Sequence, residues 1–200
     1  GGLFDIKTEQ PRHRLARLAP NGALDPADAV VALRFPVNPP YYGNAVTIFP
    51  VAGGKQLLFG NFSHVGGSAA AKVARLNSDG TLDETFMLSP LASADYSVAA
   101  LQADGKVVIG GSNGPNSLVR LSTDGSIDPA FNVGVGPINL RQMVALPGGS
   151  VLLVGAFTEV LGTPRNRIAR LAANGSLDLS YNPNFGSDTG GITCAAVQRG

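Results

Sequence analysis

The sequence predicts an all-β protein built from repeats of one four-stranded antiparallel unit. A segment with the pattern Arg-Leu-x-x-Asp/Asn-Gly-x-Leu/Ile-Asp occurs four times, within residues 15–25, 73–83, 118–128 and 168–178. A second pattern, two apolar runs around a glycine turn, alternates with it at residues 46–60, 98–110 and 143–155, and each copy predicts a β-hairpin. The 26 glycines and 14 prolines, with 44% hydrophobic residues, are typical of a turn-rich β fold and not of a disordered chain.

The spacing of these repeats predicts a β-propeller. The turn glycines at 22, 80, 125 and 175 are 58, 45 and 50 residues apart, which is the range of one propeller blade. Two hairpins per repeat give four strands, and the chain holds about 3.75 such blades. The expected divisions are a partial blade with strands three and four and an insertion (1–44), three blades (45–95, 96–140 and 141–191) and the first strand of a next or closing blade (192–200). Both ends fall inside a repeat, so we expect a piece of a longer array.

The turn of the repeated segment sets the register of its hairpin. A three-residue turn that ends in glycine is typical of a type I turn followed by a left-handed bulge residue. This register places an arginine opposite the aspartate eight residues later, and such a cross-strand pair contributes roughly 0.2–1 kcal/mol. The predicted structural pairs are Arg17–Asp25, Arg75–Asp83, Arg120–Asp128 and Arg170–Asp178. An aromatic residue follows the aspartate in three copies, as Phe86, Phe131 and Tyr181.

Two short runs, residues 107–109 and 151–154, are apolar at every position. They predict central strands that are buried on both faces between neighbouring sheets. The single cysteine, Cys194, excludes an internal disulfide and any zinc cluster made of cysteines. We expect it to be a small buried residue of a strand.

Composition and motifs exclude several function classes. A net charge of +1 gives no basic surface for nucleic acid, and no apolar run approaches the ~20 residues of a membrane-spanning helix. The sequence contains no His-Glu-x-x-His and no Gly-x-Ser-x-Gly motif, so neither zinc hydrolysis nor a serine nucleophile has its local scaffold. We assign no catalytic residue, and we expect no metal and no cofactor.

Calcium is the one metal for which the turns offer oxygen ligands, at Asn21, Asp79, Asp104, Asp124 and Asn174. No segment has the alternating Asp-x-Asp-x-Asp run that calcium loops use. We therefore interpret these side chains as turn residues.

The two motifs together resemble the delta-sixty repeat family of β-propellers. The resemblance rests on the fourfold Arg-Leu-x-x-Asp/Asn-Gly-x-Leu/Ile-Asp segment and on Ala-Leu-Gln-Ala-Asp-Gly-Lys-Val-Val-Ile-Gly-Gly at residues 100–111, and it covers nearly all of the chain. It implies a secreted or surface protein of bacteria, extracellular in location, with no established catalytic residues to carry over.

Candidate ligand-binding residues lie in the loops that join strands two and three. Arg12-His13-Arg14 and Arg165-Asn166-Arg167 occupy matching positions in the first and last copies. One hypothesis is that these loops bind an anion or an acidic glycan, because arginine binds carboxylates and phosphates through paired hydrogen bonds. The simpler interpretation is that both loops are only solvated surface loops. If the two ends of the chain join in one composite sheet, these loops form a single basic rim.

Two functions from different classes remain open. The first is a non-catalytic scaffold or recognition module whose partner is a protein or a glycan, with self-association or closure by further blades of a parent chain also possible. The second is a polysaccharide-acting enzyme with a site over the propeller channel. Its candidate carboxylates are Asp5, Glu9, Asp95, Glu159 and Asp188.

Overall fold

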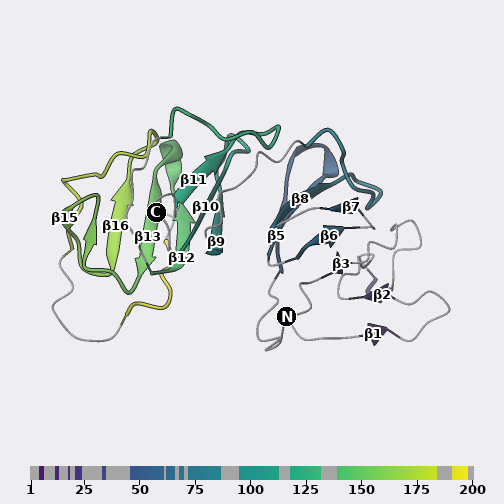
Figure 1. The fold of residues 1–200 in the computed structure, drawn as a ribbon, viewed down its shortest axis with the longest axis horizontal. Helices are drawn as coiled ribbons and strands as arrows, with labels where there is room; N and C mark the ends of the chain where they lie inside the picture. The colour runs from purple at the N-terminus through teal and green to yellow at the C-terminus, as the bar shows by residue number, and fades with distance from the viewer. Residues whose placement is uncertain are drawn as a thin grey trace. The chain divides into compact units, whose positions relative to one another are not determined.

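The chain divides into two compact units, residues 1–86 and 87–200 (Figure 1). The computed structural model describes residues 5–6, 12–13, 18, 21–23, 33–34, 46–60, 62–65, 68–69, 72–86, 95–112, 118–131, 139–183 and 191–197. Regular structure in these residues is β-strand, apart from two 3-10 turns, η1 (Ala52–Gly54) and η2 (Pro147–Gly149). The fold is therefore all-β, as predicted. None of the helical segments in the described ranges has the length and apolar character needed to cross a membrane.

The described residues of the first unit form three small antiparallel sheets. The largest has the order β4 (Val46–Pro50), β5 (Gln56–Gly60) and β8 (Val73–Leu76). A second has the order β3 (Leu33–Arg34), β6 (His64–Val65) and β7 (Ser68–Ala69), and β1 (Asp5–Ile6) pairs with β2 (Arg12–His13). One face of the largest sheet forms a core with the loop that follows β5, through Leu58, Phe62, Val65, Ala74 and Leu76.

The second unit repeats this plan in two three-stranded sheets. The first has the order β11 (Leu118–Leu121), β10 (Val107–Ser112) and β9 (Asp95–Leu101). The second has the order β12 (Leu140–Ala145), β13 (Val151–Gly155) and β16 (Ile168–Leu171). A short hairpin of β14 (Glu159–Val160) and β15 (Thr163–Pro164) extends from the second sheet.

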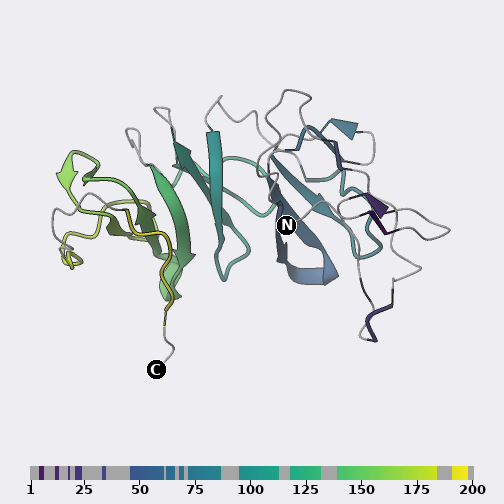
Figure 2. The ribbon, with the colours of Figure 1, turned by 90° about the horizontal axis from the view of Figure 1, so that it is seen from below.

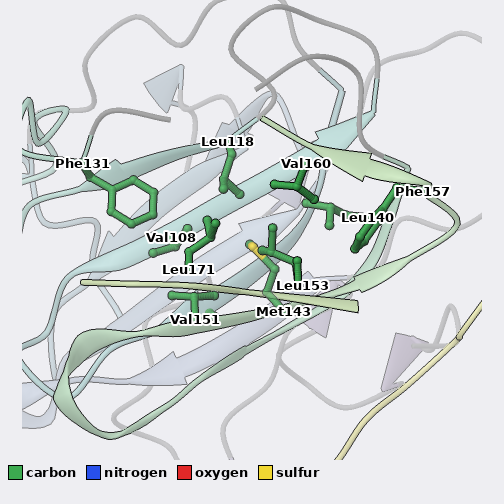
Figure 3. Packing of buried hydrophobic residues seen from close by; sticks show 12 residues of the cluster. Val108, Leu118, Phe131, Leu140, Met143, Val151, Leu153, Phe157, Val160 and Leu171 are labelled. Atoms are coloured by element: carbon green, nitrogen blue, oxygen red, sulfur yellow. The ribbon is translucent and has the colours of Figure 1, made fainter. Parts of the chain in front are cut away.

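The two sheets of the second unit pack face to face. Val108, Leu118 and Phe131 of the first sheet contact a cluster from the second that includes Met143 and Leu153 (Figure 3). The central strands β10 and β13 are buried on both faces, because Val107, Val108 and Ile109 are at most 2% exposed and the residues of β13 are all buried. The prediction of doubly buried central strands is confirmed.

The repeated turns have the predicted register. Leu76 bridges Leu82, Leu121 bridges Ile127 and Leu171 bridges Leu177. The turn glycines have positive φ angles, between 82° and 91°, at Gly22, Gly80, Gly125 and Gly175. The side-chain oxygens of Asn21, Asp79, Asp124 and Asn174 each accept a hydrogen bond from the amide two residues later. These side chains therefore act as turn residues.

Two details differ from the sequence prediction. Each large sheet has three strands, and the expected fourth strand contributes only the single bridge at Leu82, Ile127 or Leu177. The strand stops there because the next residue, an aspartate, accepts the amide of the residue two positions on, as at Asp83 and Thr85, and turns the chain. Residues 191–197 contain no strand and Cys194 is exposed, because this segment packs through Ile192 and Ala195 instead.

Candidate functional site

Each repeat that the structure describes brings its arginine and aspartate together. The shortest N–O distances are 2.7 Å for Arg75–Asp83, 3.0 Å for Arg120–Asp128 and 2.7 Å for Arg170–Asp178. The other carboxylate oxygen of each aspartate accepts the amide of residue 85, 130 or 180. The aspartate therefore joins two neighbouring strands and also fixes the turn that follows. Arg17 and Asp25, the pair of the first copy, lie outside the described residues.

The aromatic residue of each repeat covers the arginine. The guanidinium carbon lies 4.8 Å from the ring centroid of Phe86 for Arg75, 4.7 Å from that of Phe131 for Arg120, and 4.8 Å from that of Tyr181 for Arg170. This is the geometry of a cation–π contact. The recurrence of an aromatic three residues after the aspartate thus has a structural cause.

Sequence reasoning missed a lysine in this cluster. Lys55 Nζ lies 2.7 Å from Asp83 Oδ2, and Lys106 Nζ lies 2.8 Å from Asp128 Oδ2. Each lysine follows the glycine turn of the other hairpin of its repeat, so the ion cluster joins the two hairpins. The Gly-Lys pairs at residues 54–55 and 105–106 are the sequence feature that could have indicated these lysines. The third copy has Ser150 at this position.

These contacts shift the pKa of the aspartates. Hydrogen bonds from Lys55 and then Thr85 hold the pKa of Asp83 well below its ordinary value, although burial opposes the shift. Lys106 is the largest cause of the lowered pKa of Asp128. Ser180 and then Arg170 lower the pKa of Asp178. The three carboxyl groups therefore remain anionic.

The lowered pKa values predict an acid-dependent loss of stability. Because the folded carboxyls release their protons more readily than the unfolded ones, their contribution is complete above about pH 4 and disappears as the pH falls through the folded pKa values. The Lys55→Met/Lys106→Met double variant should lose less unfolding free energy between pH 5 and pH 2 than the natural chain does. Urea titrations at both pH values measure this. Equal losses in the two proteins would contradict the assigned role of the lysines.

The serine in the third copy allows a gain of stability. Ser150→Lys should place an ammonium group beside Asp178 and raise the unfolding free energy slightly, as an exposed ion pair does. Ser150→Met, which has a side chain of similar length without charge, is the matched control. The gain should disappear in an Asp178→Asn background, and a gain that persists there would have another cause.

The loops between strands two and three use the same anchors in two repeats. Phe62 and Phe157 are buried, and so are Val65 and Val160. In both loops the carbonyl of the phenylalanine accepts the amide of a basic residue, Lys72 at 3.2 Å and Arg167 at 2.8 Å. Between these anchors the loops differ, since β7 is Ser68–Ala69 and β15 is Thr163–Pro164. The two loops thus have equivalent buried anchor residues and different residues at their tips.

The basic residue at the end of each loop has a left-handed backbone. Lys72 has φ +71° and Arg167 has φ +66°, a conformation that costs a non-glycine residue roughly 1–2 kcal/mol. Both residues are half-buried. Two independent copies therefore place a cation where glycine would be more stable.

The candidate residues Arg165, Asn166 and Arg167 differ in their surroundings. Arg165 is 6% exposed, and its guanidinium donates to the carbonyls of Pro164 at 2.8 Å and Leu179 at 3.3 Å. Its side chain therefore fixes the loop, which leaves Asn166 and Arg167 as the partly exposed members.

The matching group in the first copy is described in part. Arg12 and His13 form β2, where Arg12 pairs with Ile6 and His13 with Asp5. Arg14 lies outside the described residues. The common basic rim therefore stays a prediction.

The structure describes the carboxylates of the enzyme hypothesis only in part. Glu159 is exposed, Asp5 and Asp95 belong to β1 and β9, and Glu9 and Asp188 lie outside the described residues. The described residues contain no group of three or more His, Cys, Asp or Glu side chains that could hold a metal ion.

The chain matches the model of a protein family described as "Domain of unknown function (DUF5122) beta-propeller". The match covers residues 1–27, 54–86, 102–131 and 147–181, which together make up more than half of the chain. The last three segments end at Phe86, Phe131 and Tyr181, so each contains a complete arginine, aspartate and aromatic cluster. No curated protein matches the chain. On this match and on its small antiparallel sheets, the chain belongs to the DUF5122 family of β-propeller domains.

Proposed function

We propose that this β-propeller domain is a non-catalytic recognition or scaffold module of an extracellular or cell-surface protein, in line with its resemblance to the delta-sixty repeats. Its partners bind at the loops between strands two and three, and its blades, in which the short fourth segment pairs through a single bridge, continue into a complete propeller. The carrying observation is the pair of loops with the same buried anchors, Phe62 and Phe157, and different exposed tips. A rigid support with variable loops is the usual arrangement of a binding surface.

The chemistry of the carboxyl groups favours binding over catalysis. A general acid near neutral pH needs a raised pKa, whereas the described carboxyls with shifted values, Asp83, Asp128 and Asp178, are all shifted down. Each of them is also held by the arginine of its own repeat. The recurrent charges therefore serve the sheets.

The left-handed cations favour an anionic ligand. Strained backbone persists where the surrounding structure or a function requires it, and Lys72 and Arg167 share both strain and charge. An acidic glycan presents repeated carboxylates, which arginine binds well. Arg12, His13 and Arg14 in the first unit and Asn166 in the second are the further loop residues that we assign to anion contacts, each within its own unit.

Polygalacturonate is a suitable probe. Electrophoresis in gels that contain it should retard the protein, dextran gels should not, and incubation should release no new reducing ends. Arg167→Gln should weaken the retardation, whereas Arg141→Gln, at an exposed arginine of β12, should not. Release of reducing ends would overturn the proposal in favour of the enzyme. Equal mobility in both gels would refute the acidic ligand.

The left-handed backbone of Arg167 provides a second, independent test of the proposal. Arg167→Gly should raise the unfolding free energy by about 1 kcal/mol, because glycine adopts positive φ without steric cost, and should weaken polygalacturonate binding. A loss of stability would show that the arginine side chain serves the fold.

A further inference from the structure

Arg165 is a buried cation in the loop between β13 and β16. It follows the β14–β15 hairpin, which extends from the sheet of β12, β13 and β16 (Figure 2). The residue is 6% exposed, and no carboxylate in the described part of the chain forms an ion pair with it. A buried charge without a counter-ion is costly, so an anion bound at this guanidinium would stabilise the loop.

One edge of this guanidinium has an unused donor. Nη1 donates to the carbonyl of Pro164 at 2.8 Å, and Nη2 donates to that of Leu179 at 3.3 Å. Nε is buried and has no hydrogen-bond partner. The Nε–H and one Nη2–H of an arginine point in the same direction and together match the two oxygens of a carboxylate. The open edge of Arg165 is therefore the edge suited to a carboxylate.

The same edge binds a carboxylate at two other arginines of this unit. Nε and Nη2 of Arg120 each lie 3.0 Å from Oδ2 of Asp128. Both nitrogens of Arg170 lie 2.7 Å from Oδ2 of Asp178. Arg165 therefore lacks the group that this edge holds in the repeated arginines.

The fold does not require an arginine at this position. In both units the valine that ends the first strand of the loop hairpin pairs with the residue three positions later. Counted from these pairs, Arg165 corresponds to Ala70 of the first unit. The same hairpin thus forms in a loop with alanine at this position, and the buried charge is particular to the second unit.

The side chain of Arg165 can leave its present acceptors, whereas its backbone is held. The backbone amide donates to the carbonyl of Thr158 at 2.9 Å, and Leu161 in the turn of the hairpin packs against the core of the unit. The guanidinium is held less firmly, because the bond to Leu179, at 3.3 Å, is longer than most N–H···O bonds. Its other acceptor belongs to the preceding residue. A rotation of the side chain is therefore enough to present the open edge to a ligand.

We propose that Arg165 binds the carboxylate of a uronate residue in an acidic glycan, through its Nε–H and Nη2–H. The guanidinium turns away from the carbonyl of Leu179 and pairs with the ligand as Arg120 pairs with Asp128. This inference rests on the proposed function, which assumes an acidic ligand at the same loop, and it adds the residue and the chemical group that recognise each other. A neutral glycan offers no such group.

NMR of the arginine Nε–H groups tests the proposal on the full chain. The Arg165 signal is assigned by its loss in Arg165→Lys. A galacturonate trimer should move this signal downfield, into the range of Arg120 and Arg170, whose Nε–H groups already bind carboxylates. The methyl ester of the trimer, which has no charged carboxylate, should leave the signal unchanged, and so should sodium chloride at the same ionic strength.

The affinity for the trimer, measured by calorimetry, gives a second readout. Arg165→Lys keeps the charge but loses the paired donors of one edge. It should bind about tenfold more weakly, as expected for the loss of one charge-assisted hydrogen bond. Arg141→Lys, at an exposed arginine of β12, is the matched control and should bind as the natural chain does. Arg165→Ala, which introduces the residue of the first unit, covers the case in which a buried lysine prevents folding, and it should weaken binding at least as much.

Several results would overturn the proposal. One is an Arg165 signal that the trimer does not move, or that the ester moves equally. Another is equal affinity in the natural chain and both Arg165 variants. A signal that is already downfield in the free protein, and that Asp188→Asn moves upfield, would make Asp188 the partner, a residue outside the described ranges.

The two proposals for this loop can fail separately. Retardation in polygalacturonate gels without any change at Arg165 would refute this inference and leave the proposed function standing. A trimer-dependent shift at Arg165 without retardation would support the carboxylate contact and refute the binding of the polymer.

Discussion

Replacing Asp128 with alanine should lower the unfolding free energy by about 3 kcal/mol, since removing one partner of a buried ion pair leaves the other charge uncompensated. Arg120 and Asp128 are each 7% exposed, and the arginine lies against Phe131, so little water can replace the lost carboxylate. Asp128 also accepts from Lys106 and from the amide of Ala130. The variant therefore leaves two cations and one amide without their acceptor.

Asp178→Ala is the matched control for this prediction. The same pair in the next repeat is 35% and 25% exposed and contains no lysine, so water can solvate Arg170 after the change. Its loss of stability in urea should be much smaller. Equal losses at the two positions would show that burial does not set the strength of these pairs.

Gly155→Ala should cost about 3 kcal/mol or more, as an overpacked site that cannot relax. A Cβ atom at Gly155 would lie 2.1 Å from the carbonyl oxygen of Asn139 and 3.0 Å from the Cα of Leu140. Both atoms belong to the backbone, and Asn139 is held by a hydrogen bond from the amide of Ala156 at 2.9 Å. The clash can be relieved only by moving the start of β12 away from β13.

Gly148→Ala is the control for this second prediction. Gly148 has φ +74° and no atom within 4 Å of the added carbon, so only the left-handed conformation opposes alanine, at a cost of about 1 kcal/mol. Thermal or urea unfolding of both variants measures the difference. A cost at Gly155 no larger than that at Gly148 would contradict the close approach of the two strands.

The parts of the fold that the sequence could predict are those that recur. The turn, its left-handed glycine and the opposed Arg75 and Asp83 follow from local spacing, because a turn of fixed length permits one register. Lys55 was not predicted because it reaches Asp83 from another hairpin, 28 residues away. Local spacing carries no information about such a contact.

The burial of the individual ion pairs and the structure of the loops could not be predicted from the sequence, for a related reason. Arg120 and Arg170 have the same local sequence pattern, yet the side chain of Arg120 is 7% exposed and that of Arg170 is 35% exposed. Arg165 matched the pattern of an exposed basic loop, but its guanidinium binds the carbonyls of Pro164 and Leu179. The pattern also does not show that an aspartate such as Asp83 turns the chain, which leaves the predicted fourth strand with a single bridge.

The recurring charged clusters hold the sheets together, and we propose that recognition belongs to the loops between the strands. Hydrogen exchange of the arginine Nε–H groups, followed by NMR, tests the first half directly, since Arg75, Arg120 and Arg170 each donate this proton to the aspartate of their own repeat. We predict protection at all three, greatest at Arg120 and least at Arg170. Three Nε–H groups that exchange as fast as that of the exposed Arg141 would contradict the account.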